Sequence, residues 1–94
     1  MSVVEDVFAE LQKATLKFPL WPTDPFHALS VVGEEYGELQ KAVLQHCYEK
    51  HKGVSLDDIR EEALQLAAMG LRFALSLDSY AYSEGAQHQQ GVAL

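Results

Sequence analysis

All three prolines of this 94-residue chain lie close together, at positions 19, 22 and 25. A proline ring removes an amide donor and restricts the residue before it, so Pro19 and Pro22 end a helix and form a loop. Pro25 has a different role, because Asp24 can cap the free amides of a helix in which Pro25 takes the first position. The prolines therefore predict one interruption near the N-terminus, followed by a new helix that starts at Asp24–Pro25.

Apolar residues recur at helical spacing on both sides of this loop. They predict a first helix over residues 3–16 and a second from 25 to about 47–50. After a polar connection at 51–54, Ser55 and Asp58 form a capping-box pattern that opens a third helix to about residue 77. No alternating pattern or hairpin turn indicates a strand. The predicted fold is all-α, a small helical bundle built on an antiparallel hairpin of the second and third helices.

The length and composition limit the class of protein. We expect one domain over 1–94, with its core at about 3–77 and a short helix or frayed tail at 78–94. The formal charge of −7 argues against binding to polymeric nucleic acid through phosphate contacts. Cys47 is the only cysteine, which excludes an intrachain disulfide and fits a reducing cytoplasm. With neither a leader nor an apolar span, the chain is expected to be soluble and without a membrane partner.

Several carboxylates fall where helical periodicity expects apolar side chains. In the second helix, Glu35 and Glu38 lie at the edge of an arc taken as its core face, formed by Leu29, Val32, Tyr36, Leu39, Val43 and Cys47. In the third, Glu62 falls inside the arc of Ile59, Ala63, Leu66, Met69, Gly70, Phe73 and Leu77. If the connection centres near residue 50, Glu38 lies level with Glu62, and Glu35 lies level with Gln65.

Such a cluster is unfavourable unless a cation is shared, because carboxylates in a half-buried site lose hydration and repel one another. Oxygen ligands on rigid helices suit Mg²⁺, with Mn²⁺ as a possible substitute. Glu35, Glu38, Glu62 and Gln65 are thus the candidate metal ligands. Two simpler interpretations stay open. The glutamates of the second helix could form a solvated face with Lys41, and Glu62 could pair with Arg60 or Arg72.

The segments Glu34-Glu35-Tyr36-Gly37-Glu38 and Glu61-Glu62-Ala63-Leu64-Gln65 resemble the MazG-like nucleotide pyrophosphohydrolases of the all-α NTP pyrophosphatase superfamily. The resemblance covers roughly residues 5–77. In that family an E-E-x-x-E helix and an E-x-x-D helix bind Mg²⁺ on the substrate phosphates. Glu35 and Glu38 match the first pair, and Glu62 matches the glutamate of the second helix. Gln65 stands where the family usually has Asp, which removes one negative charge.

The resemblance implies hydrolysis of a nucleoside triphosphate between the α and β phosphates, giving a nucleoside monophosphate and pyrophosphate. Glu35 or Glu38 would accept a proton from the attacking water, and Glu34 and Glu61 would orient water or support the ligands. The loop residues Lys17 and Trp21 are candidates for phosphate and base contacts, and so is Lys41. Loop aromatics nevertheless more often plug the end of a bundle.

A further apolar arc on the third helix, formed by Leu64, Ala68, Leu71 and Leu75, predicts self-association, and the resemblance implies a homodimer or tetramer. A non-catalytic helical oligomer that binds a nucleotide or protein is the alternative function, supported by Gln65. A ferritin-like di-iron bundle requires a Glu-x-x-His pair, which neither long helix provides.

Overall fold

The computed structural model describes residues 2–82 and is helical throughout its regular structure. Its elements are α1 (Val3–Lys17), α2 (Pro25–Tyr48), a 3₁₀ turn (Lys50–Lys52), α3 (Leu56–Leu75) and a second 3₁₀ turn (Leu77–Ser79). The described residues contain no strand, so the all-α prediction is confirmed. Most of the predicted tail, residues 83–94, lies outside the described residues.

Local side-chain caps fix where the helices begin. Asp24 Oδ1 accepts a hydrogen bond from the Phe26 amide at 3.2 Å, and Pro25 takes the first helical position of α2. Ser55 and Asp58 form the predicted capping box, with an Asp58 N to Ser55 Oγ distance of 3.1 Å and a Ser55 N to Asp58 Oδ2 distance of 2.8 Å. These hydrogen bonds lower the pKa of the Asp58 carboxyl.

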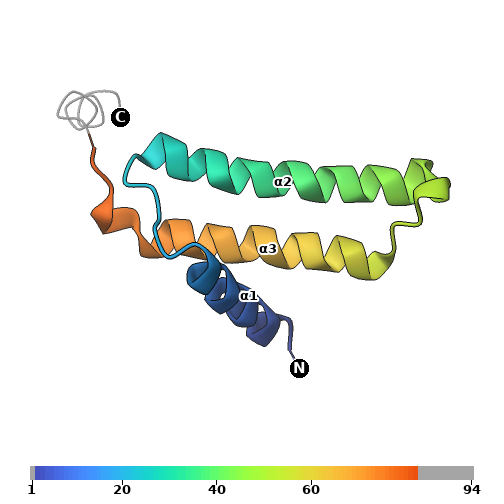
Figure 1. Cartoon of the computed structure of the whole chain (residues 1–94), viewed down its shortest axis with the longest axis horizontal. Helices are drawn as coiled ribbons and strands as arrows, with labels where there is room; N and C mark the ends of the chain where they lie inside the picture. Colours follow the sequence, from blue (N-terminus) through green and yellow to red (C-terminus); the bar gives the residue numbers. More distant parts are fainter. Residues whose placement is uncertain (1, 83–94) are drawn as a thin grey trace, which may run out of the picture.

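Helices α2 and α3 lie side by side and run in opposite directions, while α1 packs obliquely against α3 (Figure 1). The connection from α2 to α3 closes through Gly53, whose φ of 66° lies in the left-handed region that favours glycine. His46 Nδ1 also lies 2.7 Å from the Val54 carbonyl oxygen and joins the end of α2 to the segment before α3. The two long helices are therefore held at matching heights.

The face of α2 that packs on α3 differs from the predicted core face. Ala28 and Ala42 are the buried residues of α2, and the half-buried Glu35 lies midway between them at seven-residue spacing. In contrast, most of the predicted arc is exposed, namely Leu29, Tyr36, Val43 and Cys47. Small alanine side chains allow α3 to approach closely on this face. The predicted core face of α2 is thus wrong, and Glu35 lies in the helix–helix contact itself.

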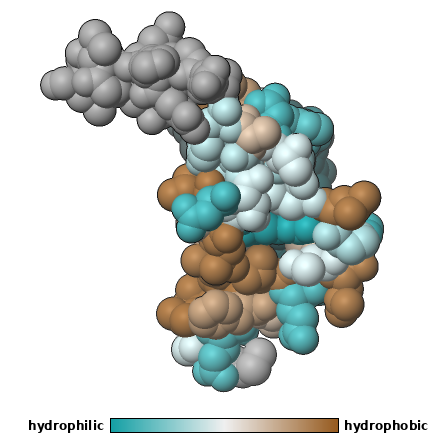
Figure 2. Space-filling model, turned by 90° about the vertical axis from the view of Figure 1, so that its left-hand side faces the viewer, coloured by the Kyte–Doolittle hydropathy of each residue, from teal (hydrophilic) through white to brown (hydrophobic). Residues whose placement is uncertain are grey.

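The core-facing side of α3 includes Met69, which is buried, and Glu62, which is half-buried one heptad before it. The arc predicted to serve self-association is covered in part within the monomer. Ala68 is buried, and Leu71 lines an apolar groove between α3 and α1, whereas Leu75 is 76% exposed. Hydrophobic side chains remain at the surface of the half of the molecule that contains α1 (Figure 2).

Candidate functional site

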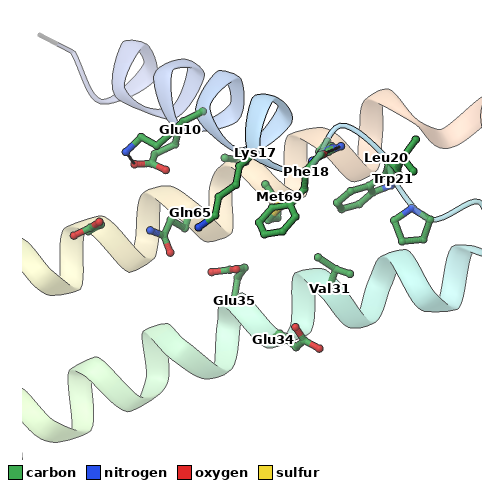
Figure 3. A pocket seen from close by; sticks show the side chains of 16 residues that line it. Glu10, Lys17, Phe18, Leu20, Trp21, Val31, Glu34, Glu35, Gln65 and Met69 are labelled. Carbon is green, nitrogen blue, oxygen red and sulfur yellow. Dashed lines mark hydrogen bonds and ion pairs between the residues drawn. The ribbon is translucent and has the colours of Figure 1, made fainter.

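A cleft of about 670 Å³ opens between α2, α3, the C-terminal half of α1 and the loop that follows α1. Its walls combine acidic, amide, cationic and aromatic side chains, among them Glu10, Lys17, Trp21, Glu34, Glu35, Glu61, Gln65 and Arg72. Figure 3 shows Glu35 and Gln65 pointing toward one another across the space between α2 and α3, with Lys17 extending from α1 toward them. The cleft therefore brings together residues of three helices.

Of the three glutamates predicted as metal ligands, Glu35 lines the cleft, whereas Glu38, which is exposed, and Glu62 lie outside its lining. Burial raises the pKa of Glu35, and neighbouring negative charges raise it further, in the order Glu62, Glu38, Glu34 and Glu10. Burial likewise raises the pKa of Glu62, followed by the charges of Glu38, Glu61 and Asp58. The three carboxylates among the four predicted ligands, Glu35, Glu38 and Glu62, thus all contribute to this repulsion. The cluster of Glu35, Glu38 and Glu62 is called the carboxylate cluster below.

Glu62 carries the least satisfied polar atom of the cluster. Its Oε2 is buried and has no hydrogen-bond partner within the described residues. The two arginines considered as partners are engaged elsewhere: Arg60 pairs with Asp57 at 2.6 Å, and Arg72 donates to the Phe18 carbonyl oxygen at 2.6 Å. The interpretation of Glu62 as half of a Glu–Arg pair is therefore wrong. A buried acceptor without a donor is unfavourable, and such atoms are rare in native proteins.

The part of the cleft near the loop that follows α1 is lined by cationic and aromatic side chains. The Lys17 ammonium lies 5.4 Å from the centre of the Phe18 ring, and the Arg72 guanidinium lies 4.8 Å from the centre of the Trp21 ring. Of the three residues predicted to contact a substrate, Lys17 and Trp21 line the cleft, whereas Lys41 is exposed and lies outside its lining. Carboxylates of α2 and α3 and cations of α1 and α3 therefore line the same cleft.

Three contributors were not assigned to the site from the sequence. Glu10 reaches the cleft from α1, where it pairs with Lys13 at 3.0 Å and adds to the field that raises the pKa of Glu35. Nothing in the helical pattern of α1 distinguishes this glutamate. Arg72 lies seven residues after Gln65, a spacing that places both on one face of α3 and could have indicated its position. Tyr80 follows α3 and is buried beside Trp21.

The donor chemistry of the carboxylate cluster fits a hard divalent cation. Within residues 2–82, no group of three or more His, Cys, Asp or Glu side chains lies close enough together to hold a metal ion. Magnesium, however, is usually bound through one or two carboxylates together with water and substrate phosphates. The unpartnered Glu62 oxygen and the mutually repelling glutamates provide oxygen donors of this kind.

No protein-family model, curated protein or solved structure matches this chain. Within the described residues, no helix is both long and apolar enough to cross a membrane.

Proposed function

We propose that this chain is a Mg²⁺-dependent nucleotide pyrophosphohydrolase of the MazG-like type, which cleaves a nucleoside triphosphate between its α and β phosphates. The observation that carries the proposal is the buried Oε2 of Glu62, which has no hydrogen-bond partner among residues 2–82 and lies near other glutamates that repel it. A cation shared by these groups would remove both penalties. The adjoining cleft supplies Lys17 and Trp21, which suit the phosphates and the base of a nucleotide.

The proposed reaction uses residues of all three helices and of the loop between α1 and α2. Glu35, Glu38 and Glu62 would hold Mg²⁺, with Gln65 offering an amide oxygen. When bound, the ion neutralises phosphate oxygens and lowers the pKa of coordinated water. Glu35 or Glu38 would accept a proton from the water that attacks the α phosphorus. A new P–O bond would form to that phosphorus, its bond to the bridging oxygen would break, and pyrophosphate would leave. Lys17 binds phosphate oxygens, and Trp21 contacts the base. Glu34 and Glu61, both exposed at the cleft, orient water.

Pyrophosphate release tests this assignment. We expect the protein with Mg²⁺ to hydrolyse at least one of a panel of canonical and modified nucleoside triphosphates. Glu38→Gln and Glu62→Gln should each lower kcat by roughly 100-fold or more, because each removes a charged oxygen donor for the ion. Asp78→Asn is the matched control, since it removes one negative charge from an exposed turn outside the cleft.

Two results would contradict the proposal. The first is an absence of turnover with every nucleotide while the fold and oligomer are intact, which would favour the non-catalytic nucleotide- or protein-binding alternative. The second is turnover that both glutamine variants retain, which would place the chemistry elsewhere.

We further propose that a second copy of the chain covers the exposed apolar face of α2, giving a homodimer or tetramer. Leu29 is 54% exposed, Tyr36 57% and Val43 40%, on the side of α2 adjacent to the face that packs on α3. Val43→Glu should shift the protein toward the monomer in sedimentation experiments, because a charge within an apolar interface is costly. Gln12→Glu adds the same charge to an exposed position of α1 and should leave the oligomer intact.

A further inference from the structure

The loop between α1 and α2 is fastened to the C-terminal end of α3. Arg72 is only 7% exposed, and its Nη2 donates to the Phe18 carbonyl oxygen at 2.6 Å. The same guanidinium lies over the Trp21 ring at 4.8 Å from the ring centre. Arg72 therefore holds the start of the loop through its backbone and covers one face of the indole.

Tyr80 fixes the edge of the same indole ring. Its hydroxyl accepts a hydrogen bond from Trp21 Nε1 at 2.9 Å and donates to the Phe73 carbonyl oxygen at 3.1 Å. The Tyr80 ring is buried and packs against the Phe73 ring, with 5.1 Å between the ring centres. The end of the loop is tied as well, because the Ala81 amide donates to the Thr23 carbonyl oxygen at 2.8 Å.

These contacts leave little freedom to Trp21. One ring face is occupied by Arg72 and the N–H edge by Tyr80, yet the side chain still lines the cleft and is only partly buried. An indole whose sole N–H is satisfied inside the protein has no polar group left to offer a ligand. What it presents to the cleft is therefore apolar aromatic surface.

We propose that Tyr80 is a positioning residue that holds Trp21 as a preformed aromatic wall on which the base of a bound nucleotide stacks. The nature of the ligand rests on the proposed function, whereas the positioning of Trp21 does not. Stacking tolerates different bases because every base has a π face, and a wall fixed in advance avoids the entropic cost of ordering it on binding. Tyr80 thus supports affinity for both purine and pyrimidine nucleotides without touching the substrate.

Tyr80→Phe tests the proposal, because it deletes the hydroxyl and keeps the ring that packs on Phe73. Trp21 is the only tryptophan, so fluorescence reports this wall directly. We expect time-resolved anisotropy to show a more mobile indole in the variant. The Kd of the α,β-methylene analogues of dATP and dCTP with Mg²⁺, measured by Trp21 quenching, should rise roughly three- to tenfold, the factor for about one hydrogen bond. KM should rise similarly and kcat should change less than about twofold.

Tyr82→Phe is the matched control, because it removes a hydroxyl that donates to the Leu77 carbonyl oxygen at 2.8 Å and leaves Trp21 untouched. Anisotropy and Kd equal in Tyr80→Phe, Tyr82→Phe and wild type would overturn the inference even if the protein hydrolyses nucleotides. A wild-type protein whose Trp21 is not quenched by either analogue would also overturn it. Quenching that weakens in Tyr80→Phe, without any hydrolysis by wild type, would support the inference and refute the proposed function.

Discussion

Two charged side chains of α3, only ten residues apart in sequence, have opposite hydrogen-bonding and electrostatic surroundings. Arg72 is buried with its charge engaged, by the Phe18 carbonyl oxygen and by the face of Trp21. Glu62 is half-buried, and one of its oxygens is enclosed without a donor while Glu38 repels it. Arg72 is satisfied by groups of its own chain, whereas the enclosed Glu62 oxygen has no donor among residues 2–82.

Arg72 and Glu62 illustrate two opposite effects that a buried charge has on the stability of a small helical protein. A charge satisfied by its own chain, such as that of Arg72, contributes to stability, and removing it leaves its partners unsatisfied. A charge without a hydrogen-bond donor, such as that of Glu62 among the described residues, lowers stability. The two residues should therefore respond in opposite directions to substitution, and the free energy of unfolding is the quantity that compares them.

The largest effect is expected at Arg72. Arg72→Met keeps much of the side-chain volume but removes the donor to the Phe18 carbonyl oxygen and the cation over Trp21. We expect the free energy of unfolding to fall by about 2 to 3 kcal/mol, as for loss of a charge-assisted hydrogen bond from a buried site. Urea unfolding at a fixed protein concentration measures this. A loss below about 0.5 kcal/mol would show that the Arg72 contacts contribute little.

Magnesium should reverse the penalty at the carboxylate cluster. Mg²⁺ at tenfold its Kd should raise the free energy of unfolding of the wild-type protein by about 1.4 kcal/mol, because the ion binds only the folded chain. Thermal unfolding with and without Mg²⁺ measures the gain, with Na⁺ at equal ionic strength as the control. Glu62→Gln should lose most of this gain, and an equal gain in both proteins would mean that the ion binds elsewhere.

Glu62→Gln should stabilise the metal-free protein. The amide has nearly the same shape as the carboxylate, but it carries no charge for Glu38 to repel and adds N–H donors. We expect a gain of about 0.5 to 1 kcal/mol in the free energy of unfolding, reduced by solvent screening of the exposed part of the side chain. Chemical unfolding in the presence of a chelator provides the measurement, with Asp78→Asn as the comparison. A destabilised Glu62→Gln variant would show that the carboxylate has a structural partner.

The smallest effect is a change of stability with pH. Because the pKa values of Glu35 and Glu62 are raised in the folded protein, the folded chain binds these protons more tightly than the unfolded chain does. Metal-free stability should therefore fall as pH rises from the ordinary glutamate pKa, about 4.3, through the raised values, and then level off. Asp58 has a lowered pKa and acts in the opposite sense, losing its stabilisation only below this window.

Unfolding curves at about pH 5 and pH 7 test whether metal-free stability falls as pH rises. These pH values are chosen because the expected fall occurs above the ordinary glutamate pKa. Wild type should gain more stability on acidification than the Glu35→Gln/Glu62→Gln double variant, in which neither group titrates. The difference isolates these two carboxyls, because all other titratable groups are the same in both proteins. Identical pH dependence in the two proteins would contradict the raised pKa values.

Sequence reasoning placed the carboxylates at the correct heights but on the wrong part of α2. Glu35 was predicted at the edge of the core face, and it lies at the centre of the contact with α3. The prediction was wrong because helical periodicity gives most weight to large apolar side chains, so Leu29 and Tyr36 outweighed Ala28 and Ala42. Close packing of two helices can instead favour small residues, and the larger ones are left exposed.

By itself, the sequence determined the features that depend on neighbours a few residues away. The prolines set the loop before α2. Asp24 and the Ser55–Asp58 capping box set where α2 and α3 begin. The spacing of the glutamates on either side of the short connection brought Glu38 near enough to affect the pKa of Glu62. The tertiary structure alone decided which face of α2 meets α3, that Glu10 joins the cleft from α1, and that Arg72 binds the loop rather than Glu62. Those outcomes depend on the rotation and docking of whole helices, where many weak contacts compete and no local pattern fixes the result.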